Sequence, residues 1–278
     1  SLLDKKLAVF QPPTAYLAQY QQPTGTRFGG NAIFNGENRK YGAMISYVFN
    51  KNELKAPEKG VETENKNDSI ILKIYNQKDS LIRTLKFKSP KKNGLHRLYW
   101  KLDEKGVYSP SRKVVNTKKE PSGIKVIPGE YKVVLRFQDL KDSTSVKVVY
   151  DPRFDISQEI LKTKYGLLKT LESKKDLAFR SVERLKSSKI TISKIKNQAK
   201  GIDEEIHKNL IISSDSIQKS IDLLIDQVLG TEDKRQGITS NKEPTVISYL
   251  NNAMNYVRQL QSLPGKTENQ LIENVNLK

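Results

Sequence analysis

The sequence has no cysteine and only two histidines, His96 and His207, among its 278 residues. Disulfides and thiol chemistry are therefore excluded. The absence of cysteine does not settle the compartment, because many secreted bacterial domains also lack it. The two histidines fall in different predicted domains, and we expect both to be ordinary surface or flanking residues. We expect no metal site and no cofactor.

Long apolar runs and catalytic motifs are missing as well. No stretch of about 18 apolar residues occurs, so we expect no transmembrane helix, and no signal peptide is visible. The zinc-protease, phosphate-loop, serine-hydrolase and calcium-loop motifs are absent. No feature pairs two carboxylates as a glycosidase requires. Asp203, Glu204 and Glu205 are interpreted as the first turn of a helix, where negative charge is favoured. We therefore expect no catalytic residue and no enzymatic activity in this chain.

Basic residues are present in excess, with 49 Lys and Arg against 31 Asp and Glu, a net charge of +18. Residues 1–152 hold 28 basic and 15 acidic side chains (+13), and residues 153–278 hold 21 and 16 (+5). The excess is spread over predicted strands and loops, and Lys outnumbers Arg, whereas base readout favours Arg. We interpret this excess of basic residues as a solvated surface and do not expect nucleic acid as a partner. The alternative is polyanion binding.

Period-two alternation of apolar residues predicts strands with one buried face. It is clearest in Gly94–Asp103, which holds the only Trp, and in Ile127–Phe137 after a Pro-Gly turn signal. We interpret these two runs as the centre of an antiparallel β-sandwich. Its predicted structural core consists of Leu98, Trp100 and Leu102 from the first run and Tyr131, Val133, Leu135 and Phe137 from the second.

Further strands are predicted at Tyr41–Phe49, Ser69–Tyr75, Ser80–Phe87 and Ser143–Tyr150. Six or seven strands in about 110 residues are typical of an immunoglobulin or fibronectin type III sandwich, which we place at residues 41–152.

Two segments of this half do not show strand periodicity. Residues 1–40 are expected to form an irregular N-terminal strap across a folded surface, or alternatively an aromatic platform for a sugar. Glu104–Lys125 is expected to be a disordered surface insertion, with a binding loop as the alternative.

Residues 153–278 show the 3.6-residue period of helices. Pro152 marks the boundary and Ser157 is a candidate N-cap for a first helix of about 40 residues. A second helix is expected to break near Ser213 and Ser214, a third begins after Pro244, and a short one ends the chain.

Charge also indicates how these helices pack. Residues 157–200 carry 12 basic and 4 acidic side chains (+8), whereas residues 201–278 carry 8 and 11 (−3). A basic helix beside acidic ones fits an up-down three-helix bundle. The alternative is that the basic helix binds an acidic partner or a membrane surface.

The order of motifs resembles a family. KYGAMISYVF, ILKIYNQKDSLIRTL, GLHRLYWKLD, IPGEYKVVLRF and VKVVYDPR, followed by a long helix, are similar to the C-terminal region of large secreted bacterial proteins. Those proteins carry sortilin-like or sialidase-type β-propellers of BNR repeats, related to glycosyl hydrolases. The sandwich also resembles the Ig-like domain of flagellar hook-capping proteins, and AVFQPPTAYLAQY resembles the strap that joins the last propeller blade to it. Lys101 and the long insertion at 104–126 depart from the family pattern.

The resemblance implies an accessory role. The chain is expected to be an α+β, multidomain protein in which an Ig/FnIII-like sandwich precedes the three-helix bundle at 153–278. It would be a non-catalytic module that braces an upstream β-propeller of the same polypeptide or mediates contacts with an envelope protein or glycan. The alternative is a carbohydrate- or polyanion-binding module that uses the basic surface and the 104–126 loop.

The resemblance implies an extracytoplasmic location. The start at Ser1 rather than Met suggests a mature product or an excised piece of a longer protein.

Overall fold

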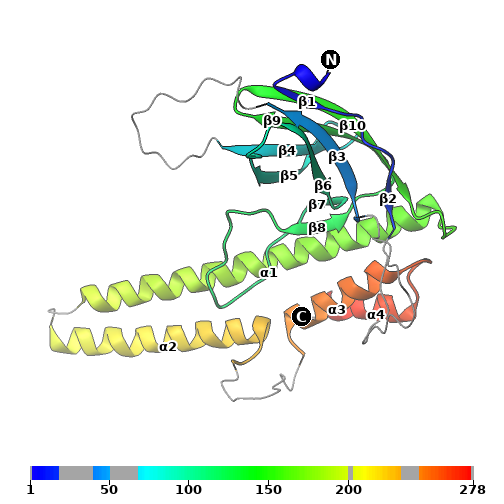
Figure 1. Ribbon diagram of the computed structural model, residues 1–278. Coiled ribbons are helices and arrows are strands. Elements are labelled where there is room, and N and C mark those ends of the chain that lie inside the picture. Colours follow the sequence, from blue (N-terminus) through cyan, green and yellow to red (C-terminus); the bar gives the residue numbers. More distant parts are fainter. Residues whose placement is uncertain (1, 19–39, 51–67, 200–202, 233–243, 277–278) are drawn as a thin grey trace, which may run out of the picture. The chain divides into compact units, whose positions relative to one another are not determined.

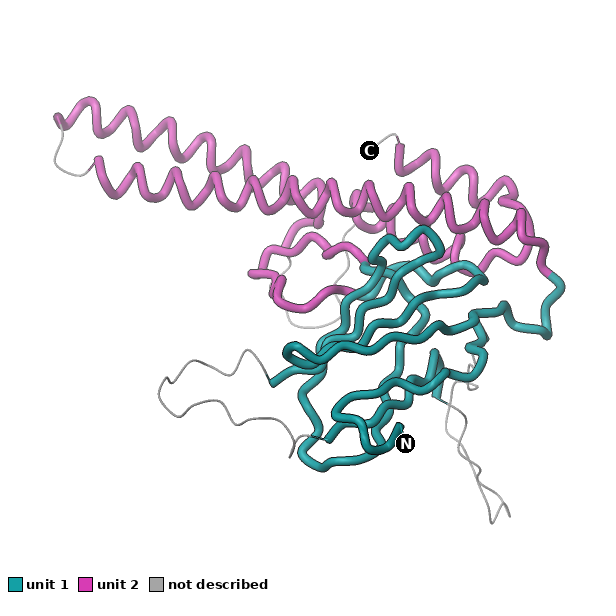
Figure 2. Tube along the Cα trace, turned by 90° about the horizontal axis from the view of Figure 1, so that it is seen from above, with its two compact units in different colours: residues 1–105, 122–155 teal, residues 106–121, 156–278 magenta. Residues whose placement is uncertain are grey.

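The structure is a computed structural model that describes residues 2–18, 40–50, 68–199, 203–232 and 244–276. Helices account for 43% and strands for 28% of these residues, so the α+β class predicted from the sequence is confirmed. The chain divides into two compact units (Figure 2). Unit 1 contains residues 1–105 and 122–155, and unit 2 contains residues 106–121 and 156–278.

Unit 1 holds a three-stranded sheet, a five-stranded sheet and a two-stranded ladder, preceded by a short 3-10 turn at Leu2–Asp4 (Figure 1). The first sheet has the order β1-β3-β6, with strands Leu7–Val9, Ala43–Phe49 and Gly94–Trp100. The second has the order β2-β10-β9-β4-β5, with strands Ala15–Leu17, Leu140–Tyr150, Gly129–Phe137, Ser69–Tyr75 and Leu81–Lys88. The ladder pairs β7 (Asp103–Lys105) with β8 (Ser122–Lys125).

The pairings between the strands of unit 1 are antiparallel except one. β3 pairs with β6 through Ile45 and Leu98, and β4 pairs with β9 through Leu72 and Leu135. Only β2 runs parallel to its neighbour, β10. This places the strands predicted near Trp100 and Tyr131 in different sheets.

One hydrophobic core is built from side chains of both larger sheets. Aromatic rings from opposite sheets meet edge to face: Phe49 and Phe137 at 4.7 Å between centroids, Trp100 and Tyr131 at 5.4 Å. The predicted core residues Trp100, Leu102, Tyr131, Val133, Leu135 and Phe137 are all buried in it, and Leu98 is half-buried against it. Leu102 follows the end of β6 with a positive φ of 55°, so it reaches the core from a turn rather than from the strand.

The first 18 residues contribute two short strands to this core. β1 pairs with β3 and β2 with β10, and the Val9 N–H donates to the Asp142 carboxylate at 2.8 Å. No strand was predicted in this segment, because each strand has only three residues, too few for a period to be visible. Residues 19–39, which include Tyr20, Phe28 and Phe34 of the expected strap, lie outside the described residues.

Unit 2 contains four described helices: α1 (Gln158–Gln198), α2 (Glu204–Leu229), α3 (Val246–Gln259) and α4 (Lys266–Asn276). The predicted cap is confirmed, since the Ser157 hydroxyl accepts a hydrogen bond from the Ile160 N–H, and α1 has 41 residues. Asp203 caps α2 by accepting from the N–H groups of Glu205 and Ile206. The predicted break near Ser213 and Ser214 is wrong. α2 is continuous there, and Ser214, a small residue, is buried in it.

The helices of unit 2 are arranged along α1 (Figure 1). α2 lies along the second half of α1, as the ion pair Lys189–Asp222 shows, and α3 lies along the first half, where the Lys164 ammonium donates to the Leu260 carbonyl. Two shorter helices therefore follow one another along a single long one. In the expected up-down bundle, the three helices would lie side by side. Here α1, with 41 residues, is about as long as α2 (26 residues) and α3 (14 residues) placed end to end.

The predicted insertion is an ordered part of both units. Residues 103–105 and 122–125 form the β7–β8 ladder, while residues 106–121 belong to the helical unit. The Lys186 ammonium on α1 donates to the carbonyls of Ser111 and Lys113, and the ring of Tyr108 lies 5.4 Å from that of Phe179. The expectation of a disordered insertion is therefore wrong. Contacts between residues about 70 positions apart order the loop.

Candidate functional site

Unit 1 has a cavity of about 310 Å³ where β2, β3 and β10 meet. Its wall contains aromatic and charged side chains from segments distant in the sequence, together with Ala18, Gly42 and Pro152. The side chains that could contact a ligand are Tyr16, Lys40, Tyr41, Asp151 and Arg153. Tyr16 is 42% exposed, which leaves one of its surfaces free to stack on a ligand.

Asp151 is the buried acid of this cavity. Its carboxylate accepts hydrogen bonds from the Arg153 Nε at 2.9 and 3.1 Å and from the Arg153 backbone N–H at 3.0 Å. These bonds, with a smaller attraction to the guanidinium, lower the pKa of Asp151 despite its burial. Asp151 therefore stays ionised at neutral pH.

Tyr41 also lines the cavity. Burial, and secondarily the charge of Asp103, raises the pKa of Tyr41 to about 12. The Lys125 ammonium lies 4.6 Å from the centroid of the Tyr41 ring, within the range of a cation–π contact. Neither Tyr41 nor Asp151 changes its protonation state near neutral pH. This arrangement suits hydrogen bonding and stacking rather than proton transfer.

The residues considered for chemistry in the sequence analysis do not line this cavity. His96 Nε2 lies 2.8 Å from the Lys92 carbonyl and its ring packs 5.6 Å from that of Tyr47, while His207 is half-buried on α2. Within the described ranges, no three His, Asp or Glu side chains gather as metal ligands. Asp203, Glu204 and Glu205 form the N-terminal turn of α2, as predicted.

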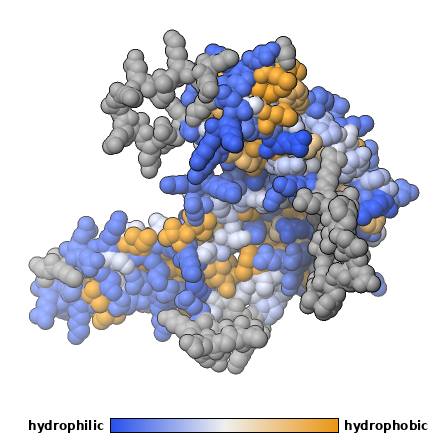
Figure 3. Space-filling view, in the orientation of Figure 1, coloured by the Kyte–Doolittle hydropathy of each residue, from blue (hydrophilic) through white to orange (hydrophobic). Residues whose placement is uncertain are grey.

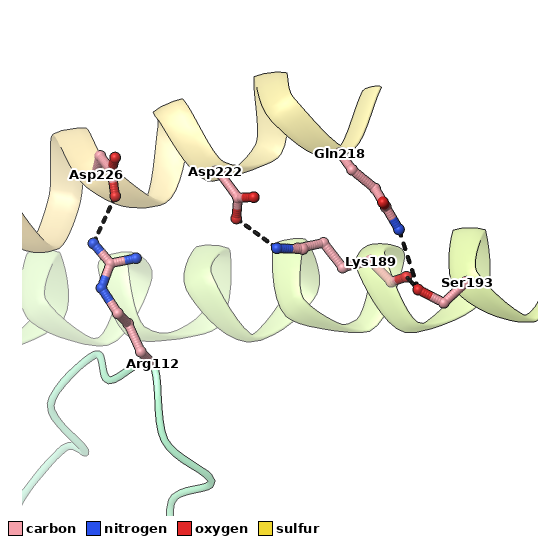
Figure 4. Close-up of polar contacts among 6 residues, drawn as sticks. All are labelled: Arg112, Lys189, Ser193, Gln218, Asp222 and Asp226. Carbon is pink, nitrogen blue, oxygen red and sulfur yellow. Dashed lines mark hydrogen bonds and ion pairs between the residues drawn. The ribbon is translucent and has the colours of Figure 1, made fainter. Parts of the chain in front are cut away.

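A second notable surface lies on the hairpin formed by α1 and α2. One side of the hairpin carries a polar ladder, which we define as Arg112–Asp226, Lys189–Asp222 and Ser193–Gln218 (Figure 4). The first two contacts measure 2.6 Å and the third 3.1 Å. Lys196 and Asp215 add a further ion pair nearer the tip.

Arg112 connects the loop of residues 106–121 to the C-terminus of α2. Its guanidinium donates to the Asp226 carboxylate and to the carbonyl of the C-cap residue, Gly230. A cation at this end complements the helix dipole and satisfies a carbonyl that has no partner within the helix. Arg112 therefore binds α2 at two points, the side chain of Asp226 and the C-terminal carbonyl of Gly230.

Apolar side chains lie on another side of the same hairpin. We define the apolar face as Leu177 and Ile195 on α1 with Ile206, Ile217 and Leu224 on α2, all between 45% and 60% exposed. At about 100° per residue, the three α2 members lie about 140–160° around the helix from Asp222. Apolar surface is visible over the hairpin in Figure 3. The polar ladder and the apolar face therefore lie on different sides.

Comparison with known proteins provides no relative from which a function could be inferred. No family model, no curated protein and no solved structure matches the chain. None of the described helices has the length and apolar content needed to cross a membrane.

Sequence reasoning did not identify the residues that make up these two surfaces. Residues 151–153 were interpreted only as the end of the sheet. Tyr16 belongs to the segment expected to form a strap or, as the alternative, an aromatic platform for a sugar, but its neighbours in the cavity were not predicted. Arg112 and Asp226 are separated by 114 positions, and no local pattern connects them. A sequence signal for the apolar face did exist: the apolar stripe of α2, with Ile206, Ile217 and Leu224, is wider than packing against one helix requires.

Proposed function

We propose that this chain is a non-catalytic accessory module, an Ig/FnIII-like sandwich joined to a helical unit. In this proposal it mediates protein contacts at the cell envelope or braces a β-propeller that lies upstream in the same secreted polypeptide. The location outside the cytoplasm is part of the proposal and rests on the family resemblance of the motifs.

Strand order supports the Ig-like assignment. If β1, β3 and β6 are the first, second and fifth strands of such a sandwich, they form one sheet, and β5, β4, β9 and β10 form the other in the order C′-C-F-G. The parallel β2–β10 pair sits at the edge of the second sheet. The single Trp is a departure, because Trp100 lies on the fifth strand of this scheme, whereas antibody domains place it on the third.

Tyr131 supports the same assignment independently. It lies near the start of β9, and its hydroxyl donates to the Ile127 carbonyl at 2.7 Å. Ig-like sandwiches carry a tyrosine at the start of the sixth strand whose hydroxyl bonds back to the backbone a few residues upstream. Burial raises the pKa of Tyr131, so the hydroxyl keeps its proton and remains a donor.

The observation that carries the proposed function is the apolar face of the α1–α2 hairpin. Five large aliphatic side chains, each about half-exposed, share one side of the hairpin. Grouped exposed apolar residues on a soluble domain mark interaction sites more often than scattered ones do. The polar ladder holds the two helices together, so this side is free to contact a partner.

The first test is to read the gene upstream of Ser1. Propeller repeats and a signal peptide there would support the proposal, and a start codon immediately before Ser1 would contradict the propeller part of it. The upstream propeller and this chain would then be produced separately and titrated by calorimetry. Saturable binding supports bracing, and no heat of binding at micromolar concentrations contradicts it.

Carbohydrate binding is a second candidate, favoured by the cavity of unit 1. Tyr16 offers a partly exposed aromatic ring, and the ionised Asp151 and Arg153 offer an acceptor and donors for sugar hydroxyls. The loop of residues 106–121 is a weaker candidate than the sequence indicated, because Arg112 is already paired with Asp226.

A glycan array tests this candidate. Wild-type binding that is lost in Tyr16→Ala and retained in Tyr256→Ala would support the cavity, since Tyr256 is a comparably exposed tyrosine on α3. Retention on heparin that falls steeply with salt, and is unaffected by Tyr16→Ala, would instead indicate binding through the basic surface.

A further inference from the structure

The apolar face of the hairpin has the geometry of a helix-packing surface. On α2, residues 206, 210, 213, 217, 221, 224 and 228 recur at intervals of four and three, and all except Ser213 are Ile, Leu or Val. Such spacing is the seam of packed helices. Ile221 is buried against α1, whereas Ile206, Ile217 and Leu224 on the same broad stripe remain exposed. The stripe is therefore wider than its contact with α1.

The polar residues of this face are mostly serine and threonine, and two of their hydroxyls have acceptors within their own helix. Ser181, Ser188 and Thr191 on α1 and Ser213 and Ser220 on α2 lie among the apolar side chains by helical spacing, with Arg184 as the central charge and Arg180, paired with Asp176, at the margin. The Thr191 hydroxyl donates to the Ser187 carbonyl at 3.2 Å, and the Ser220 hydroxyl donates to that of Ser216 at 3.1 Å. Burying the hydroxyls of Thr191 and Ser220 therefore leaves neither donor without an acceptor, which lowers the cost of covering this part of the face.

The area of the face matches that of a stable interface. The 26 residues of α2 extend for about 39 Å at 1.5 Å per residue. Two helices packed side by side are about 20 Å wide. The face therefore covers about 800 Å², which is what each partner buries in a standard protein interface.

We propose that the apolar face is a self-association surface on which two copies of this chain pack into a four-helix bundle. Because the face carries almost no charge, it has no means of selecting an acidic or basic partner, and an identical face complements it. The proposed two-fold axis is parallel to the helices and lies in the plane of the interface. It places α1 of each copy over α2 of the other, so that all neighbouring helices are antiparallel.

Charge around the face favours this axis over the alternatives. Residues 177–198 of α1 carry six basic side chains and one acidic (+5), whereas residues 204–229 of α2 carry two basic and five acidic (−3). An axis along the hairpin places each basic helix over an acidic one. An axis across the hairpin would place α1 over α1 and bring like charges together, which is unfavourable.

This inference rests on the proposed interaction role, because it names a partner for that surface. Sedimentation equilibrium on the full chain tests it without any upstream propeller, so its failure is distinguishable from failure of propeller binding. The expected mass is twice 31.7 kDa. The double variant Ile217→Glu, Leu224→Glu should weaken the dimer at least about 100-fold, because it buries two charges in the centre of the interface.

The matched control is Ile212→Glu with Leu223→Glu. Both residues are 59% exposed and lie about 100–140° around α2 from Ile217 and Leu224, so this variant should sediment as the wild type does. Circular dichroism would show that both variants remain helical. A wild-type chain that is monomeric at 100 µM would overturn the proposal. So would equal effects of the two double variants, whether both dissociate the dimer or neither does.

The axis is tested by cross-linking, which is simple because the chain has no cysteine. Ile195 of one copy and Ile217 of the other lie at the same height in the proposed bundle. A mixture of Ile195→Cys and Ile217→Cys chains should form a disulfide-linked dimer under mild oxidation, whereas either variant alone should form little. A dimer from Ile195→Cys alone would overturn the proposed axis.

Discussion

At the scale of single residues, Gly42 and Trp100 determine how β3 enters the core. Gly42 has a φ of +113°, and a Cβ atom there would lie 2.3 Å from the Trp100 carbonyl oxygen. The Trp100 indole N–H in turn donates to the Asp103 carbonyl at 2.8 Å. The backbone before β3, the end of β6 and the start of β7 are therefore held together without a side chain at position 42.

Gly42→Ala is expected to destabilise unit 1 by more than about 3 kcal/mol, because it combines backbone strain with a clash against backbone atoms. Gly94→Ala is the matched control. Gly94 has a φ of +112° but no atom within 4 Å of its Cβ position, so only strain applies and about 1–2 kcal/mol is expected. Urea unfolding monitored by the fluorescence of Trp100 measures both. Equal losses in the two variants would show that the clash is absent.

The buried ion pair between Arg83 on β5 and Asp103 on β7 is a second residue-scale determinant. The two side chains are 4% and 3% exposed, with 3.6 Å between charged atoms. Asp103→Ala is expected to cost about 3–5 kcal/mol, because it removes one partner of a buried ion pair while the guanidinium stays buried. Lys132→Ala, which removes the exposed Lys132–Asp79 pair, should cost less than about 1 kcal/mol in the same unfolding measurement.

Acid stability depends on Asp151. The Arg153 hydrogen bonds lower its folded-state pKa, so the ionised form stabilises the fold above the unfolded pKa, and this stability is lost as the pH falls through the lowered value. Arg153→Gln should raise the pKa of Asp151 and move the acid-unfolding midpoint to higher pH. Arg97→Gln, which removes the same charge from an exposed site, should move it less. Equal shifts would indicate an effect of net charge alone.

At the scale of elements, the loop of residues 106–121 acts as a brace for the helical unit. It contacts α1 through Lys186 and Phe179 and contacts the end of α2 through Arg112. Arg112→Ala should lower the thermal midpoint recorded at 222 nm, with a loss of about 1–3 kcal/mol, because the Gly230 carbonyl and Asp226 lose a charged donor. The control is Lys189→Ala, which removes only an exposed pair and should cost less than about 1 kcal/mol. A larger effect of Lys189→Ala would contradict the bracing role.

At the scale of the whole molecule, unit 2 is built from two separate stretches of the chain. The Gly106 N–H donates to the Pro121 carbonyl at 3.0 Å, so the ends of the loop are adjacent. Replacing residues 107–120 with two glycines should therefore leave the Trp100 fluorescence transition of unit 1 unchanged and destabilise the helices. A common loss in both transitions would show that the two units unfold together.

Sequence periodicity was a good guide wherever a segment is long and has one buried face. It located the strands around Trp100 and Tyr131, the 41 residues of α1 and the cap at Ser157. It failed where the determining contact is remote. The loop that includes Arg112 had the composition of a disordered segment, and only its contacts with α1 and α2 order it. The up-down bundle was expected from a basic helix followed by acidic ones, but charge does not specify which part of α1 each later helix lies along.

The sequence by itself determined that the chain is α+β, that its first half contains strands and that its second half contains long amphipathic helices. These properties follow from local periodicity, since a strand or helix must bury its own apolar residues. Only the tertiary structure decided which sheet each strand joins, that β2 lies parallel to β10, and that Asp151, Arg153 and Tyr41 share a cavity. It also decided which apolar residues of α2 are covered by α1 and which remain exposed. The physical reason is that burial and charge pairing depend on neighbours in space, and those neighbours are up to 134 positions apart in this chain.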